Sequence, residues 1–145
     1  MSNPMEGLDE VLANIAALGN PKATKKAATK AARKAMNVVR KQVATNAKAI
    51  DDPNSPTKVW KNVKTKAKKS RNKEEIIMQV GLKGGAKKPE GNVPDSTWYW
   101  RFVELGTSNM PAQPFLRVAL YNNAREVEQI FISSFNEEIM KEINR

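Results

Sequence analysis

The chain contains no cysteine and no histidine among its 145 residues. Without cysteine there is no disulfide, no thiolate metal site and no thiol nucleophile. Without histidine the chain lacks the side chain best suited to proton transfer near neutral pH, which is also the commonest zinc ligand. An enzyme built from this sequence would have to use carboxylates, lysine, tyrosine or serine. We therefore expect no metal ion, no cofactor and no enzymatic activity.

Long apolar runs are also missing, and the spacing of the acidic residues does not favour a catalytic pair. The acidic residues often occur as direct neighbours, as in Glu74-Glu75 and Glu137-Glu138. Neighbouring side chains on a helix point in different directions, so such pairs suit a solvated surface better than a catalytic dyad. No apolar run approaches the roughly 20 residues that cross a bilayer. The N-terminus begins acidic, without the basic and then apolar order of a secretory signal. We expect a cytoplasmic product that does not enter a membrane.

The charge of the chain is unevenly distributed along the sequence. The formal net charge is +10, from 25 Lys and Arg against 15 Asp and Glu. Residues 22–73 hold 17 basic side chains against only Asp51 and Asp52, a net charge of +15. Residues 1–21 carry three acids and no base, and residues 104–145 have a net charge of −2. The sequence is therefore basic in its middle and acidic at both ends.

Two interpretations of the basic block are open. The simpler one is a solvated surface that maintains solubility, and the other is a surface that contacts DNA or an acidic partner. Lysine outnumbers arginine in the block, which disfavours recognition of specific bases. Trp60 is its only aromatic residue, so it offers no series of stacking platforms for single strands. The candidate DNA-facing or partner-facing residues are Lys25, Lys26, Lys30, Arg33, Lys34, Lys64, Lys66 and Lys68.

Apolar spacing in residues 1–50 predicts two helices. The first covers residues 6–18 and can end at Gly19. Asn20 is then a favourable N-cap, and Pro21 is tolerated as the first residue of a second helix that continues to about Ala49. The first half of the second stripe is mostly alanine, which allows close approach of a neighbour but buries little area. The stripes are Leu8, Val11, Leu12, Ile15 and Leu18 in the first helix, and Ala28, Ala31, Ala35, Val39, Val43, Ala47 and Ile50 in the second.

Residues 51–113 are predicted to form loops and a small sheet. Residues 51–57 have the composition of a loop, with two prolines among polar residues. The alternation in "NVKTKAK" and the β-rich run "EIIMQVGLK" predict a hairpin across the polar turn "KSRN". The lysines of the first strand would face solvent or a partner.

The segment before the last helix is ambiguous. Residues 83–96 are predicted to be a loop because they are rich in glycine and proline. Their glycines do not follow the order of a phosphate-binding loop, so no such role is predicted. Residues 97–106 fit either a third strand or a helix, since their aromatic residues satisfy both spacings. We expect these aromatic side chains to lie in a core or an interface, and mostly in the core.

The C-terminal residues 114–145 predict one long helix. Pro114 suits its first turn. An unbroken helix of about 30 residues would extend on the order of 45 Å, and Asn122-Asn123 is the expected place for a bend. A helix of that length extends beyond a small core and suits contacts with neighbouring subunits. Its apolar stripe consists of Leu116, Leu120, Ala124, Val127, Phe131, Phe135, Ile139 and Ile143.

These segments together predict an α+β fold in one domain, residues 1–145. Residues 1–50 form a helical N-terminal part, and residues 51–113 contain the loops and a small antiparallel sheet. The sheet is one hairpin, with a third strand if residues 97–106 are extended. The long helix of residues 114–145 packs on this sheet. At 145 residues the chain is long enough for one core and too short for two independent ones.

The segment Tyr99–Leu120, "YWRFVELGTSNMPAQPFLRVAL", resembles the signature of the minor tail or tail-completion proteins of long-tailed bacteriophages. Members typically carry an aromatic residue, then Phe-Val-Glu-Phe-Gly-Thr, then Met-Pro-Ala-x-Pro-Phe-Leu-Arg-Pro-Ala. Leu105 stands where the family usually has Phe, and Val118 where it often has Pro. Residues 51–62 lack the Thr-Gly usual before the hairpin. The matching residues are Phe102, Val103, Glu104, Gly106, Thr107, Met110, Pro111, Ala112, Pro114, Phe115, Leu116, Arg117 and Ala119.

The resemblance implies a structural virion protein of the neck or tail top. Such a protein completes the tail or joins it to the head. It is expected to be a monomer in solution and to assemble in the virion as a ring of six or twelve copies. Its expected partners are the tail tube or terminator protein and the head connector. Its expected location is the virion, and the host cytoplasm during assembly. The alternative function is a basic protein that contacts DNA non-specifically, for which salt-dependent binding to duplex would be the sign.

Within the signature, several residues have expected structural roles. Gly106 can adopt a positive φ and end the element before it. Pro111 and Pro114 stiffen the crossing into the last helix. Phe115 and Leu116 are expected to anchor that helix in the core.

Glu104 is the unusual member of the signature, because it is a carboxylate between two apolar residues. A buried carboxylate needs hydrogen-bond donors or a cation. We expect it to accept hydrogen bonds from backbone N–H groups of the turn at residues 107–109, or to pair with Arg101 or Arg117. A catalytic role is disfavoured because no second acid is near in the sequence.

Overall fold

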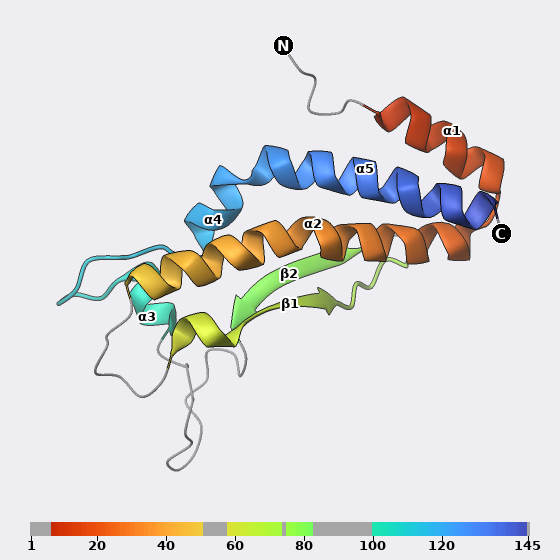
Figure 1. The fold of residues 1–145 in the computed structure, drawn as a ribbon. Coiled ribbons are helices and arrows are strands. Elements are labelled where there is room, and N and C mark those ends of the chain that lie inside the picture. Colours follow the sequence, from red (N-terminus) through yellow and green to blue (C-terminus); the bar gives the residue numbers. More distant parts are fainter. Residues whose placement is uncertain (1–6, 51–57, 74, 83–99, 145) are drawn as a thin grey trace. The chain divides into compact units, whose positions relative to one another are not determined.

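The structure is a computed structural model that describes residues 7–50, 58–73, 75–82 and 100–144. The described residues contain helices and one two-stranded antiparallel sheet, which confirms the predicted α+β class (Figure 1). The hairpin appears where the alternation predicted it. The elements are α1 (Leu8–Leu18), α2 (Pro21–Ala49), the 3-10 helix η1 (Val59–Asn62), β1 (Val63–Lys68), β2 (Ile77–Leu82), α3 (Trp100–Leu105), α4 (Arg117–Asn122) and α5 (Ala124–Ile143).

The chain divides into two compact units. Unit 1 comprises residues 1–38, 66–79 and 123–145, and unit 2 comprises residues 39–65 and 80–122. The helix α2 and both strands therefore have residues in each unit. The single domain over the whole chain stays a prediction.

Unit 1 is built on three helices. Its core joins Val11 of α1, alanines of the first half of α2, and the α5 residues Ile132, Phe135 and Ile139. Figure 1 shows α5 beside the first half of α2, with α1 against α5. The alanines in this core are Ala27, Ala28 and Ala31. Their small side chains suit close approach of another helix, which explains why an alanine stripe is sufficient here.

The connection between α1 and α2 follows the predicted capping chemistry. Gly19 has φ 57° and its N–H donates to the Ile15 carbonyl at 3.1 Å, which ends α1. The Asn20 side-chain oxygen accepts from the Ala23 N–H at 3.2 Å and so caps α2. The α1 stripe is only partly correct, because Val11 is buried but Leu12 is more than half exposed.

The stripe predicted for α2 is confirmed over most of its length. Six of its seven predicted residues are buried, and the seventh, Ile50, is exposed just beyond the end of the helix. The six are Ala28, Ala31, Ala35, Val39, Val43 and Ala47. The valines belong to unit 2, together with the buried residues Leu82, Phe115 and Ala119.

The C-terminal helix differs from the predicted one. Residues 114–116 are not helical, and α4 begins only at Arg117. The helix is interrupted at Asn123, where a bend was predicted, and α5 begins at the next residue. The predicted stripe fails at Leu120, Ala124 and Ile143, which are exposed, and the fully buried residue of α4 is Ala119. The interruption breaks the register between α4 and α5, so one stripe cannot continue through both.

The ambiguous segment is helical where the structure describes it. Trp100–Leu105 forms α3, so no third strand is present in residues 100–106. The predicted loops at residues 51–57 and 83–96 lie outside the described residues, and so do residues 97–99. Among the described helices, none is long and apolar enough to cross a membrane.

Candidate functional site

The signature residues form a corner in unit 2, from Phe102 to Arg117, that begins at the end of α3. Gly106 has φ 78°, and its N–H donates to the Phe102 carbonyl at 2.8 Å. A Cβ on Gly106 would lie 2.8 Å from the backbone nitrogen of Ala112. Both the positive φ and the close backbone approach therefore require glycine here. The predicted role of Gly106 is confirmed.

A tight turn follows Gly106. Thr107 and Met110 form an isolated antiparallel bridge, with the Thr107 N–H donating to the Met110 carbonyl at 2.9 Å. The Asn109 N–H donates to the Thr107 hydroxyl at 3.3 Å. The chain then returns to α3, because the Gln113 N–H donates to the Val103 carbonyl at 2.8 Å. These bonds give the corner a defined backbone path.

Glu104 joins α3 to the start of α4. Its side chain is only 6% exposed, and its two carboxylate oxygens accept from the backbone N–H groups of Leu116 at 2.9 Å and Arg117 at 3.0 Å. The prediction of backbone N–H partners was right in kind but wrong in place, since the donors lie at the start of α4 and not in the turn at residues 107–109. The first N–H groups of a helix lack partners within the helix, which makes them available to this carboxylate.

The corner is also bonded to the last turns of α2. The Asn46 side-chain amide donates to the Phe115 carbonyl at 3.3 Å, and it accepts from the Gln42 amide at 2.8 Å. Phe115 is buried as predicted, while Leu116 is half-buried. Because both oxygens of Glu104 accept hydrogen bonds from backbone N–H groups, this carboxylate fixes the backbone geometry of the corner. Among the described residues, no group of His, Cys, Asp and Glu could hold a metal ion.

Large apolar side chains are exposed on the corner and on α4. Tyr121 is 83% exposed and Leu105 is 63% exposed. The aromatic residues of this region were predicted to lie in a core or an interface, and mostly in the core; Phe102 is exposed, Trp100 is half-buried, and Trp98 and Tyr99 lie outside the described residues. Tyr121 was missed by sequence reasoning, because its exposure depends on which face of α4 is buried. We call the exposed apolar residues of unit 2 around the corner the apolar patch: Phe102, Leu105, Met110, Val118, Leu120 and Tyr121.

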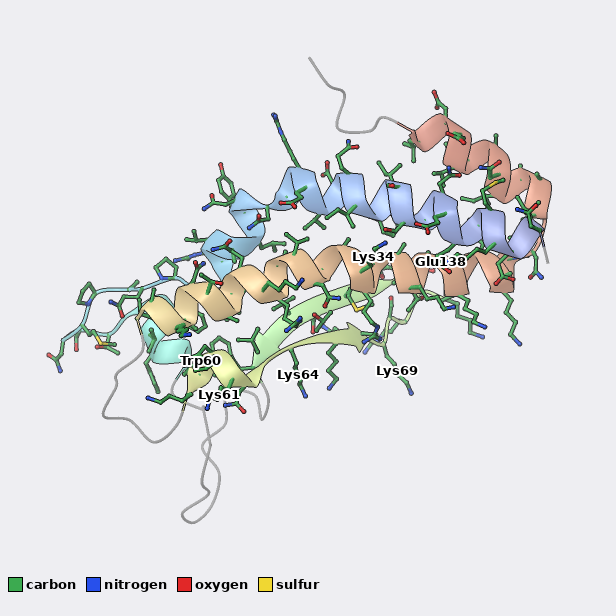
Figure 2. All side chains as sticks on the ribbon, in the orientation of Figure 1. Lys34, Trp60, Lys61, Lys64, Lys69 and Glu138 are labelled. Atoms are coloured by element: carbon green, nitrogen blue, oxygen red, sulfur yellow. The ribbon has the colours of Figure 1, made fainter. Side chains whose placement is uncertain are left out.

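The candidate basic residues are distributed over several elements. Lys26, Lys30, Arg33 and Lys34 share a shallow hollow on one face of α2 in unit 1. Lys30 lies 4.0 Å from the Glu138 carboxylate of α5, which also pairs with Lys141 at 3.4 Å. Figure 2 shows Glu138 on the side of α5 that faces α2. The helical basic face therefore has an acidic neighbour.

The remaining candidates lie elsewhere. The Lys25 ammonium donates to the Lys73 carbonyl at 2.6 Å, so it links α2 to the segment before β2. Lys64, Lys66 and Lys68 are exposed along β1, as the alternation predicted. Lys64 belongs to unit 2 and the other seven candidates belong to unit 1, so a single basic surface made of all eight stays a prediction.

A second gathering of lysines lies around Trp60 in unit 2. The ammonium of Lys48, near the end of α2, lies 5.0 Å from the centre of the Trp60 ring. The ammonium of Lys61 lies 5.2 Å from the same ring. Sequence reasoning missed the approach of Lys48, although a single tryptophan in a lysine-rich block was a signal for such contacts.

Comparison with known proteins agrees with the resemblance of the signature. No curated protein and no solved structure matches the chain. One family model matches residues 9–106, about two thirds of the chain, and it describes a bacteriophage HK97-gp10 tail component. The match includes nearly all of α1, then α2, the hairpin, α3 and the beginning of the corner, and it ends at Gly106. The chain belongs to the HK97-gp10-like family, and it is a structural protein associated with bacteriophage tails.

Proposed function

We propose that this tail component is a tail-completion or head-to-tail joining protein that assembles as a ring at the neck or tail top. The family membership supports a role in the virion and contacts with other virion proteins. The finer role rests on the apolar patch, which is the observation that carries the proposal. The ring would contain six or twelve copies, and the chain would stay monomeric until it meets its partner.

The apolar patch has the properties of a protein–protein contact. Exposed apolar residues are ordinary when they are scattered singly. Here six large ones are exposed on α3, the turn after it and α4, and this number within a short stretch of chain supports contact with a partner. Burial of one such side chain contributes on the order of 1.5–3 kcal/mol. The Gly106 turn and the Glu104 hydrogen bonds hold the segments that carry the patch, so less ordering is needed when a partner binds.

The proposal is tested by replacing the two most exposed patch residues, Leu105→Ser with Tyr121→Ser. Because both are exposed, the variant should fold as the wild type does but lose the contact. When this variant is supplied to a phage that lacks its own copy of the gene, we expect electron microscopy to show separate heads and tails. Native mass spectrometry of the variant mixed with tail tube protein should show no ring. The wild type should restore joined virions and show the number of copies in the ring.

The control for this test is Leu12→Ser. Leu12 is also an exposed leucine, but it lies on α1 in unit 1. We expect this variant to assemble normally. Joined virions at wild-type yield from the patch variant would reject the role of the patch, and virions that are complete without the protein would reject the proposed function.

A further inference from the structure

The exposed charged side chains in the described part of unit 2 are all cationic. Its only described carboxylate is Glu104, which is buried and already bonded to two backbone N–H groups. The positive side chains in this part therefore have no exposed carboxylate within the unit's described residues to neutralise them. They include Lys41, Lys48, Lys61, Lys64 and Arg117.

Trp60 organises part of this charge. The ring attracts the ammonium groups of Lys48 and Lys61 through its negative face, at 5.0 and 5.2 Å from the ring centre. The two lysines come from α2 and η1, so the ring collects charge from two separate elements. Within η1, the Asn62 side-chain amide donates to the Lys58 carbonyl at 2.8 Å and supports the turn that carries Trp60. Lys64 is exposed two residues beyond η1 (Figure 2).

We propose that Lys48 and Lys61, which lie at the Trp60 ring, contact the phosphate backbone of double-stranded DNA together with the exposed Lys64. Lysine ammonium groups bind phosphate as point charges and do not require a particular base. Trp60 is half-buried and has two ammonium groups at its ring, so it is not free to stack on an unpaired base. The contact is therefore with phosphates, independent of sequence, and does not favour single strands.

The basic face of α2 is a weaker candidate for the same ligand. Glu138 lies 4.0 Å from Lys30 and also pairs with Lys141, so a carboxylate already neutralises part of this face. A phosphate that approaches it would meet a negative charge. Lys26, Lys30 and Lys34 of α2 therefore form a triplet with the same formal charge as Lys48, Lys61 and Lys64 but with an acidic neighbour.

The experiment compares the two triplets in the 145-residue chain. One variant carries Lys48→Gln, Lys61→Gln and Lys64→Gln, and the control carries Lys26→Gln, Lys30→Gln and Lys34→Gln. Each variant loses the same formal charge. The probe is a fluorescein-labelled 30-base-pair duplex of random sequence, and binding is followed by fluorescence anisotropy from about 50 to 300 mM NaCl.

The inference predicts a loss of salt dependence in the first variant. Each lost phosphate contact lowers the slope of log affinity against log salt by about 0.9, so three contacts lower it by up to about 2.7. The α2 variant should keep a slope within about one unit of the wild type. Equal losses in both triplets would show that only net charge matters and would overturn the inference. Absence of duplex binding by the wild type at 50 mM NaCl would overturn it too.

Two variants of Trp60 test its organising role. Trp60→Phe keeps an aromatic face and should keep most of the affinity, whereas Trp60→Leu removes the face without changing charge and should weaken binding several-fold. Stronger binding to a single strand than to duplex would contradict the phosphate contact. The inference does not depend on the proposed ring, because binding is measured on the isolated protein, and patch variants should bind duplex as the wild type does.

Discussion

Glu104 connects two helices of unit 2 through two hydrogen bonds from backbone N–H groups. Hydrogen bonds to a charged group contribute more than neutral ones, and a buried group that loses its partner carries a desolvation cost. Glu104→Gln keeps one acceptor oxygen and places an amide donor against a second N–H group. We expect this change to lower the free energy of unfolding by about 1–3 kcal/mol, measured by urea denaturation.

The control for Glu104→Gln is Glu137→Gln. Glu137 is exposed on α5, so the same chemical change should leave the urea midpoint nearly unchanged. If Glu104→Gln has a midpoint equal to that of the wild type, the two hydrogen bonds do not hold the corner.

Gly106 is required by both its backbone angle and its surroundings. Alanine at φ 78° costs about 1–2 kcal/mol, and its Cβ would also press on the Ala112 backbone nitrogen at 2.8 Å. We expect Gly106→Ala to lower the free energy of unfolding by more than that strain alone. The matched change is Gly81→Ala in β2, where a Cβ would meet no atom within 4 Å. Its thermal midpoint should differ little from the wild type, and an equal loss in the two variants would refute this account of Gly106.

Among whole elements, α5 has one face buried in the core of unit 1 and another face exposed, and only the buried face should contribute strongly to stability. Ile139 is 0% exposed in the core of unit 1, and Ile143, one turn later, is 37% exposed. Ile139→Ala leaves a cavity among α1, α2 and α5, and we expect it to lower the free energy of unfolding by about 2–5 kcal/mol. Ile143→Ala should lower it by on the order of 1 kcal/mol or less. Circular dichroism in urea measures both, and similar losses would place the core of α5 elsewhere.

The helix α2 illustrates which element properties follow from local sequence. Its N-cap at Asn20 and its buried stripe from Ala28 to Ala47 both follow from residue type and spacing, and both were predicted. The position of the break before α5 was also predicted, from Asn122-Asn123. The start of α4 was not, because Pro114 permits a first turn without requiring one.

The whole molecule presents two kinds of surface on unit 2, one apolar and one cationic. The apolar patch supports assembly with other virion proteins, and the lysines at Trp60 support contact with duplex. Since different residues carry the two properties, the proposed variants should separate them. A patch variant should fail to join heads and tails while retaining its affinity for duplex. The Lys48, Lys61 and Lys64 variant should lose duplex affinity while still joining heads and tails.

The sequence alone determined α1, α2, the hairpin and the family resemblance, because these depend on residues close together in the chain. The buried stripe of α2, the hairpin alternation and the turn at Gly106 are of this kind. Tertiary structure decided which faces are buried and which distant residues meet. Glu104 accepts hydrogen bonds from Leu116 and Arg117, and the Lys48 ammonium lies at the Trp60 ring. The face of α4 that contains Ala119 is buried, and Tyr121 is exposed. Such outcomes depend on how packed elements close on one another, and no local pattern of residues specifies that closure.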